Sequence, residues 1–388
     1  MDPIALSILI FLLLFFLLAI GLPIGFSMAA TGFLGSALLI DIDAALALLG
    51  QTAFETTITF NLSIVPMFIL MGYFASNSGL SEDLFRACNT WLGHRRGGLA
   101  LATIGGCGAF AAVCGSSIAT AATMTQVALP EMKRFNYDYS LATGSIAAGG
   151  TIGILIPPSV ILVLYGILTE TNIGELFLAG FIPGILTIIF FMATISIVTR
   201  IYPDIGPRGD KTSFKQKMMA FKDVWGTVIL FVLVIGGIYT GIFSPEEAAG
   251  IGASGALTLA LFARTMTWPI FVDCLMKTVT TSAMIFTILI GAILFNNFLV
   301  LSAVPDAIGS WIGSLPFSST AIMLIILLIY LIMGCALDSL AMILLTIPIF
   351  FPVVANLGFD PIWFGIIVVM VVELGLITPP VGMNLSMP

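Results

Sequence analysis

The basic residues of this chain occur in only four short segments. All thirteen lysines and arginines lie in Arg86–Arg96, Lys133–Arg134, Arg200–Lys222 and Arg264–Lys277. Elsewhere apolar runs of about 17 to 25 residues follow one another, and each is long enough to cross a hydrocarbon core of about 30 Å. Only 9% of the 388 residues are charged, whereas soluble domains carry about 25%. The sequence therefore predicts an all-α polytopic membrane protein.

The placement of these four segments predicts the topology. Cytoplasmic loops are enriched in Lys and Arg, so all four segments are expected on the cytoplasmic side. The apolar sequence between successive segments amounts to an even number of passes, and the reversals at 169–175 and 244–247 contain acids but no bases. The stretch 4–20 lacks the basic start and the cleavage site of a secretory signal, so it is expected to be the first membrane helix.

An internal repeat links the middle of the chain to its last third. TWLG at 90–93 corresponds to SWIG at 310–313, Cys114 to Cys335, Pro130 to Pro352 and Pro157-Pro158 to Pro379-Pro380. Five apolar passes separate the two units, and an odd number inverts one relative to the other. Inverted repeats are typical of secondary transporters. We accordingly divide the chain into N-terminal scaffold helices (1–61), a first repeat (62–200), a cytoplasmic loop with scaffold helices (201–278) and a second repeat (279–388).

A Gly-x-x-x-Pro-Pro motif interrupts an apolar run in each repeat. Proline has no N–H, so it removes the hydrogen bond to the carbonyl four residues earlier. Pro157 would free the carbonyl of Gly153, and Pro379 that of Gly375. Because an unpaired carbonyl is costly in hydrocarbon, it must face protein, water or a ligand. The duplicated motif predicts a Na⁺ ion at each break, and the alternative is a simple helix kink.

Each break follows an apolar segment that is too short to cross the membrane twice. These segments are expected to be re-entrant hairpins with small or polar residues at their tips, which pack closely and offer oxygen ligands. The hairpins are predicted at 97–131, turning at 113–119, and at 319–352, turning at 333–339; the broken helices are predicted at 140–168 and 361–388.

Two acids and the helix ends near the breaks are further candidates for function. Placing the acid Asp338 in the membrane costs roughly 2.5–3.5 kcal/mol, which makes it a functional candidate. Glu373 is a second candidate, although a helix-packing salt link would also explain it. The N-termini of half-helices carry free N–H groups that favour an anion such as a carboxylate.

Five stretches of the sequence resemble the large membrane subunit of the tripartite ATP-independent periplasmic (TRAP) transporters. They are VPMFILMGYFASNSGLSEDLF at 65–85, CGSSIATAAT at 114–123, AAGGTIGILIPPSVILVLYG at 147–166, GELFLAGFIPG at 174–184 and ITPPVGMNL at 377–385. The resemblance extends from about residue 20 to residue 385.

The resemblance implies an elevator-type, Na⁺-driven importer of an organic acid, such as a C4-dicarboxylate or sialic acid, in the bacterial inner membrane. It implies two partners, a small four-helix membrane subunit and a periplasmic substrate-binding protein, and two Na⁺ ions but neither ATP nor an organic cofactor. The implied Na⁺ ligands are Ser116, Ser117, Gly153 and Ile156 in the first repeat and Gly334, Cys335, Gly375 and Thr378 in the second. The implied substrate contacts are Ser116, Pro158, Ser159, Asp338, Pro380 and Asn384.

The same residues also allow other interpretations. A stand-alone citrate-type symporter or arsenite-type permease would share the hairpins but need no binding protein. An intramembrane serine hydrolase would need a base beside CGSSI, and the single histidine, His94, lies in a basic loop. No GxxxxGK[ST] motif occurs, so ATP is not expected as the direct energy source. No nucleic-acid partner is expected, and the five scattered cysteines are expected to be free and buried.

The family pattern continues beyond the GMNL motif at 382–385, whereas this sequence ends three residues later. Either the sequence is truncated or the protein lacks the second half of its last repeat, and a protein that lacks it is expected not to transport.

Overall fold

The structure is a computed structural model that describes residues 2–305, 307, 309–310, 316–335 and 337–378. All regular structure within these ranges is helical, which confirms the all-α prediction. The first half forms α1 (Pro3–Ala19), α2 (Ile24–Leu39), α3 (Ile42–Ile58), η1 (Phe60–Ser63), α4 (Ile64–Ser76), α5 (Leu80–Leu92), α6 (Gly98–Cys114), α7 (Ser117–Arg134), α8 (Tyr139–Leu155), α9 (Val160–Thr169) and α10 (Ile173–Ile201). The second half forms η2 (Pro203–Ile205), α11 (Phe214–Asp223), α12 (Trp225–Tyr239), α13 (Pro245–Phe262), α14 (Trp268–Leu301), α16 (Ser319–Gly334), α17 (Ser339–Asn356) and α18 (Pro361–Leu376).

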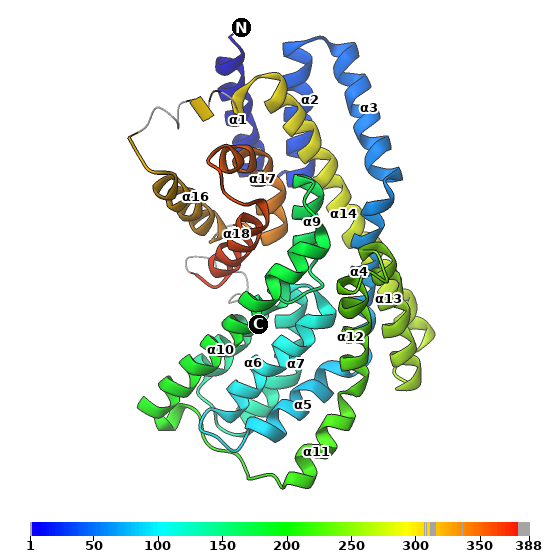
Figure 1. The fold of residues 1–388 in the computed structure, drawn as a ribbon, viewed down its shortest axis with the longest axis vertical. Helices are drawn as coiled ribbons and strands as arrows, with labels where there is room; N and C mark the ends of the chain where they lie inside the picture. The colour runs from blue at the N-terminus through cyan, green and yellow to red at the C-terminus, as the bar shows by residue number, and fades with distance from the viewer. Residues whose placement is uncertain (1, 306, 308, 311–315, 336, 379–388) are drawn as a thin grey trace.

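The long helix α14 packs against three helices from the N-terminal part of the chain. It packs along α2 and also contacts α3 and α4, while α13 lies beside α4 (Figure 1). A Cβ at Gly25 would lie 2.8 Å from the backbone nitrogen of Ile288, and one at Gly32 would lie 2.6 Å from that of Phe295. Small residues allow helix backbones to approach closely in a membrane. The α2–α14 pair therefore meets backbone to backbone.

The helix α14 begins earlier than the sequence predicted. The predicted crossing starts at 279, after a cytoplasmic segment that ends at Lys277, whereas α14 starts at Trp268 with Pro269 in its first turn. Proline is favoured there because the first N–H groups of a helix have no partner in any case. The 34 residues of α14 extend about 51 Å at 1.5 Å per residue, well beyond a hydrocarbon core of about 30 Å. Lys277 consequently lies within the helix and not in a loop.

The helix boundaries repeat along with the sequence. Helices α7 and α17 begin at Ser117 and Ser339, an offset equal to that between the two proline pairs, and α8 and α18 begin at the same offset. Asp138 and Asp360 occupy the N-caps of α8 and α18, where each side chain accepts a hydrogen bond from a backbone N–H of the first turn. In Figure 1 the α6–α7 pair lies below the α16–α17 pair, with α9 packed against α17 and α18 packed against α8.

The apolar surface of the protein is that of a membrane protein. Within the described residues, α10, α14 and α17 are each long and apolar enough to cross a membrane, and three bent helix pairs would also qualify, among them α8 with α9. Large apolar side chains are exposed around the outside, for example Leu12 at 63% on α1 and Ile182 at 68% on α10. Such a surface is unfavourable in water. These faces are therefore the ones that contact lipid.

The basic loop between α10 and α11 forms hydrogen bonds with residues that lie just before α6 and α8. The Gly97 N–H donates to the Gly206 carbonyl at 2.9 Å, and the Asp138 N–H donates to the Ile205 carbonyl at 3.0 Å. The Tyr137 hydroxyl donates to the Pro207 carbonyl at 2.8 Å. Because these bonds join the loop to the starts of α6 and α8, the ends of the hairpin and of the broken helix are held together.

The α2–α14 contact generates a first prediction. Replacing Gly32 by Leu would force a side chain into the α14 backbone, so we expect most of the protein to be lost as aggregate. Gly50 on α3 has nothing within 4 Å of an added Cβ, so Gly50→Leu is the matched control and should leave the protein intact. Size-exclusion profiles of a fluorescent fusion measure both, and equal monodisperse peaks would refute the contact.

Candidate functional site

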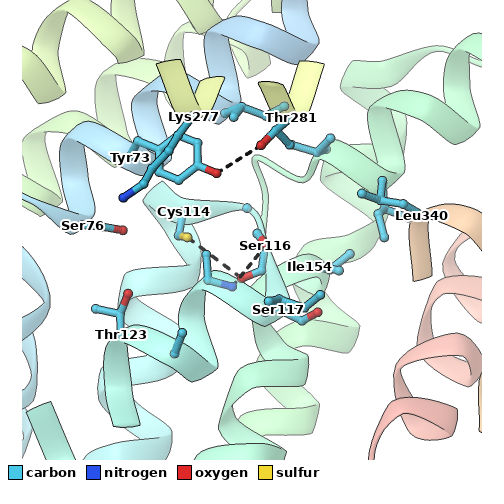
Figure 2. Close-up of a pocket in the computed structure, with 18 of the residues that line it drawn as sticks. Tyr73, Ser76, Cys114, Ser116, Ser117, Thr123, Ile154, Lys277, Thr281 and Leu340 are labelled. Carbon is cyan, nitrogen blue, oxygen red and sulfur yellow. Dashed lines mark hydrogen bonds between the residues drawn. The ribbon is translucent and has the colours of Figure 1, made fainter. Parts of the chain in front are cut away.

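A cavity of about 340 Å³ lies where the two helical hairpins approach the α4–α14 wall. One wall is formed by α4 and α14, and Figure 2 shows Tyr73 and Lys277 side by side on it, with a 3.2 Å hydrogen bond between the hydroxyls of Tyr73 and Thr281. The α6–α7 tip faces this wall, and the start of α17 also contributes. Because both tips and the start of α9 line it, the cavity is the principal candidate for binding.

The first hairpin tip covers the first helix break. Gly115 turns the chain between α6 and α7 at a φ of +65°, and a Cβ there would lie 2.5 Å from the Pro158 carbonyl oxygen. A Cβ on Gly153 would lie 2.7 Å from the Ser116 carbonyl oxygen and 2.7 Å from Thr120 Oγ1. Only glycine fits at either position, since any side chain would collide with a backbone oxygen.

Unused oxygen atoms gather at this contact. Pro157 and Pro158 provide no N–H, and among the described residues no group from beyond α8 donates to the carbonyls of Gly153 or Ile154. Thr120 Oγ1 is buried and also has no hydrogen-bond partner among the described residues. Buried polar groups normally have partners, so this set of oxygens is suited to a ligand that accepts electron pairs.

The remaining candidates of the first repeat surround the same contact. Ser116 is the N-cap of α7 and Ser159 the N-cap of α9, and each hydroxyl accepts a hydrogen bond from a first-turn N–H. Ser117 is 1% exposed and lines the cavity. Ile156 ends α8, and its side chain lies next to Gly184 of α10. The structure thus brings Ser116 against Gly153 and the neighbouring Gly115 against Pro158, while the Ile156 side chain packs away from the cavity.

The second tip meets its helix in the same way. A Cβ on Gly375 would lie 2.6 Å from the Gly334 Cα atom, so α16 and α18 touch through their backbones. The Cys335 thiol donates to the Leu331 carbonyl at 3.3 Å. Thr378 is the last described residue, and Pro380 and Asn384 lie outside the described residues.

The predicted bare carbonyl at Gly375 is wrong in one respect. The Thr378 N–H donates to the Gly375 carbonyl at 3.0 Å, which replaces the bond that Pro379 cannot make. The last turn of a helix commonly tightens to such a three-residue bond when the normal donor is missing. A carbonyl oxygen has two lone pairs, so one acceptor site remains. The Thr378 hydroxyl donates to the Leu374 carbonyl at 2.6 Å, and its own lone pairs stay free.

Asp338 has a structural role that the sequence did not reveal. It is the N-cap of α17, and its carboxylate accepts a 2.6 Å hydrogen bond from the Ala341 N–H. In the sequence repeat it corresponds to Ser116, the N-cap of α7, so the two tips carry a serine and an aspartate at equivalent places. Asp338 also lines the cavity, so capping does not prevent contact with a ligand.

Glu373 on α18 is buried between the two tips. It is 2% exposed, and its Oε1 accepts a 2.9 Å hydrogen bond from the Ser339 hydroxyl at the start of α17. The Ser117 hydroxyl of the other tip lies near the same carboxyl. Oε2 has no hydrogen-bond partner among the described residues. The packing explanation by a salt link is wrong, because the partners are hydroxyls and not a cation.

Four residues of the site were missed at the level of sequence. Ser339 was recoverable, because it corresponds to Ser117 when the two proline pairs are aligned. Thr120 lies one helical turn after Ser116, and i to i+4 spacing places both on one face. Tyr73 and Lys277 carried no local signal, since their approach depends on how α4 packs against α14.

The residue types at the site exclude some chemistry. No group of three or more His, Cys, Asp or Glu side chains that would hold a transition metal gathers within the described ranges. The available donors are carbonyl and hydroxyl oxygens, which hard cations prefer. His94 lies on the α5–α6 loop and does not line the cavity. Partial burial and then the charges of Lys217, Arg95 and Lys211 lower its pKa. Because His94 does not line the cavity, it does not stand beside the serines of the first tip as the base of a serine hydrolase would.

Comparison with known proteins identifies the class and then the family. The fold matches that of the YdaH transporter of Alcanivorax borkumensis with a TM-score of 0.61 and 15% identity, over 89% of this chain and 81% of that one. The two chains thus share a fold. The chain belongs to the DctM component family of the tripartite ATP-independent periplasmic transporters, whose family model matches residues 11–387.

Two relatives illustrate the family. The chain is 39% identical over 334 residues to the C4-dicarboxylate TRAP transporter large permease protein DctM of Pseudomonas aeruginosa, covering 86% of this chain and 78% of that protein. It is 32% identical over 374 residues to the sialic acid TRAP transporter large permease protein SiaM of Vibrio cholerae, covering 95% and 86%. The predicted family is confirmed, and the protein is a transporter permease and not an enzyme.

The Glu373 contact generates a second prediction. Glu373→Leu removes the acceptor of the buried Ser339 hydroxyl, which costs about 1–3 kcal/mol, so we expect a lower midpoint of thermal unfolding in detergent. Glu373→Gln keeps an acceptor and should stay close to wild type. In a double-mutant cycle, Ser339→Ala should add little to Glu373→Leu because both remove one bond. Fully additive losses would show that the two side chains are not coupled.

Proposed function

We propose that this chain is the transport subunit of a Na⁺-driven importer of organic acid anions, with C4-dicarboxylates as the first candidates. The relative with 39% identity is a C4-dicarboxylate permease, and the family is by name ATP-independent and tripartite. The proposed partners are a small four-helix membrane subunit and a periplasmic substrate-binding protein. The proposed location is the bacterial inner membrane, with the four basic segments on the cytoplasmic side.

The first Na⁺ ion is assigned to the contact between the α6–α7 tip and the α8–α9 break. This assignment rests on one observation above others: the buried Thr120 hydroxyl has no partner among the described residues and sits 2.7 Å from a Cβ position on Gly153, beside the Ser116 carbonyl. The residues that would hold the ion are Gly153, Ile156, Ser116, Ser117 and Thr120. Neutral oxygens from a carbonyl-rich turn suit a hard cation, so the residues present fit Na⁺.

The second Na⁺ ion is assigned to the equivalent contact in the second repeat. Gly334 and Gly375 touch there, and the hydroxyl of Thr378 has unused lone pairs. Cys335 would take part through its carbonyl, since its thiol already donates to the Leu331 carbonyl. Only one lone pair of the Gly375 carbonyl is free, so this site depends more on its other ligands than the first does.

The anion is assigned to the cavity beside the tips. Helices α7 and α9 both begin at its wall, and their first residues line it. Helix N-termini bind carboxylates through free N–H groups and the positive end of the dipole. Ser116 and Asp338 line this end of the cavity. Pro158, Ser159, Pro380 and Asn384 are kept as proposed contacts from the sequence.

Transport is proposed to follow an elevator mechanism with inverted repeats. The cavity lies between the α4–α14 wall and the two hairpin tips, so movement of the hairpins along that wall would carry the anion across. Bound Na⁺ would hold each tip against its broken helix, and the substrate would bind only to the ordered tips.

A stand-alone anion carrier is the alternative. The fold does not distinguish a stand-alone carrier from one that depends on a binding protein. The solved structure that shares this fold is only 15% identical, which is too distant to indicate how substrate is delivered. The distinguishing measurement is uptake by proteoliposomes with and without the binding protein. Uptake that needs no binding protein would favour the stand-alone carrier.

The proposed first Na⁺ site generates a third prediction. Thr120→Val should raise the Na⁺ concentration for half-maximal succinate uptake about three- to tenfold, because one neutral ligand contributes on the order of 1 kcal/mol. Thr103 on α6 is equally buried, but its hydroxyl is bonded to the Leu99 carbonyl at 2.9 Å. Thr103→Val is therefore the control and should leave the Na⁺ response unchanged.

The measurement uses proteoliposomes that contain both membrane subunits, with the binding protein outside and no ATP. Wild type should respond sigmoidally to Na⁺, since two ions are proposed. Uptake driven by a proton gradient in Na⁺-free buffer would rule out the proposed coupling.

A further inference from the structure

One face of α14 forms a stripe that runs into the cavity. Asp273, Lys277, Thr281 and Ile285 are spaced four residues apart, which places them on the same face of a helix. Lys277, Thr281 and Ile285 line the cavity. The stripe therefore passes from an ion pair to a hydroxyl to an apolar side chain along the cavity wall.

Lys277 is held on this wall by an acid of its own helix. Its ammonium lies 2.7 Å from the Asp273 carboxylate, and both side chains are about half exposed, at 54% and 51%. Figure 2 shows the lysine side chain alongside Tyr73, whose hydroxyl is bonded to Thr281. The half-exposed lysine thus lies on the same wall of the cavity as the Tyr73–Thr281 hydrogen bond.

The two charged side chains on the cavity wall differ in how free they are to bind a ligand. Among the described residues that line the cavity, only Lys277 and Asp338 are charged. Asp338 is fixed as the N-cap of α17. An anion that enters the cavity finds one positive side chain, and that side chain is neutralised by Asp273 from outside the lining.

We propose that Lys277 is a substrate-binding residue whose ammonium exchanges Asp273 for a carboxylate of the transported anion. This inference rests on the proposed function. It identifies Lys277 as the positive charge that pairs with the anion in the cavity. One carboxylate would bind Lys277 next to Thr281 and Tyr73, and the other end of the anion would face the N-termini of α7 and α9. Two separate anion-binding features in one cavity favour a dicarboxylate over a monocarboxylate.

The exchange is physically easy in both directions. An exposed i to i+4 ion pair contributes little, because water screens it and two flexible side chains must be ordered. The lysine side chain carries a compact charge on a flexible stem of four carbons, so it changes partner without moving its helix. A strong permanent counter-charge would hold the anion in the cavity, whereas one that returns to Asp273 permits release.

The test compares three variants with one control. Lys277→Gln removes the charge, Lys277→Arg keeps it, and Asp273→Asn frees the lysine from its partner. Arg86→Gln is the control, because Arg86 forms the same kind of exposed i to i+4 pair with Glu82 at 2.9 Å and does not line this cavity. The probe is radiolabelled succinate, bound at equilibrium to the purified complex of both membrane subunits in Na⁺ buffer.

We expect Lys277→Gln to weaken succinate binding about tenfold, as for loss of a bond to a charged group at a partly screened site. Lys277→Arg should stay within about threefold of wild type, because the positive charge is kept. Asp273→Asn should tighten binding, and Arg86→Gln should change nothing. A purely structural ion pair predicts instead that Lys277→Gln and Asp273→Asn act alike, since both break the pair.

Equal effects of Lys277→Gln and Asp273→Asn, or no effect of Lys277→Gln, would overturn the inference. The proposed function fails separately, if wild-type proteoliposomes with the binding protein show no Na⁺-dependent uptake of succinate, of sialic acid or of any other organic acid offered. Comparing succinate with a monocarboxylate such as butyrate completes the test. Lys277→Gln should reduce the preference for succinate, and an unchanged preference would count against the exchange.

Discussion

An unpaired backbone carbonyl in a hydrocarbon environment is the constraint on which this structure depends. Pro157 and Pro158 leave such carbonyls at the break between α8 and α9, and lipid offers no donor. At the end of α18 the Thr378 N–H bonds to the Gly375 carbonyl, which leaves that oxygen one free lone pair. The protein responds by placing a hairpin tip on each break. At the first break the fit is so close that glycine is required at both Gly115 and Gly153. At the second, Gly334 and Gly375 touch through their backbones. The two proposed Na⁺ sites lie at these two contacts between a hairpin tip and a helix of the same repeat.

The two covered breaks are not independent of each other. Glu373 belongs to α18, yet its carboxyl is bonded to Ser339 of the second tip and lies near Ser117 of the first. Helix α17 packs against α9, and α18 packs against α8, so each half of the repeat supports the other. A shift of either tip would therefore disturb the partners of the same buried acid. This arrangement gives a physical route by which occupation of one site would affect the other.

Much of the fold and of the candidate site could be predicted from the sequence, because the proline pairs and the internal repeat determine them. The offset that relates the two proline pairs also relates the starts of α7 and α17, and proline removes a donor wherever it stands. The misses have a different origin. The Gly375 carbonyl is partly satisfied because the last turn of α18 tightens, a local adjustment that no spacing encodes. Lys277 was placed at the end of a cytoplasmic segment because cytoplasmic loops are enriched in Lys and Arg. Its place on α14 follows from the length of that helix and from the Asp273 partner that accompanies it.

The close packing of the α2–α14 pair bears on the proposed elevator mechanism. Gly25 and Gly32 bring α2 against the α14 backbone at distances that leave no room for sliding, and close-packed backbones resist gradual deformation. On the hairpin side, Lys277, Thr281 and Ile285 of α14 face the cavity, while α14 also packs against α17. In the proposed elevator mechanism, the relative motion takes place between α14 and the hairpins. A charge on α14 and the helix N-termini on the hairpin side would then stand on opposite sides of that boundary. An anion held by both would resist that motion, whereas an anion released by Lys277 would be free to travel with the hairpins. The weak Asp273 pair is well suited to this, since it re-forms and balances the charge of the lysine once the anion has left.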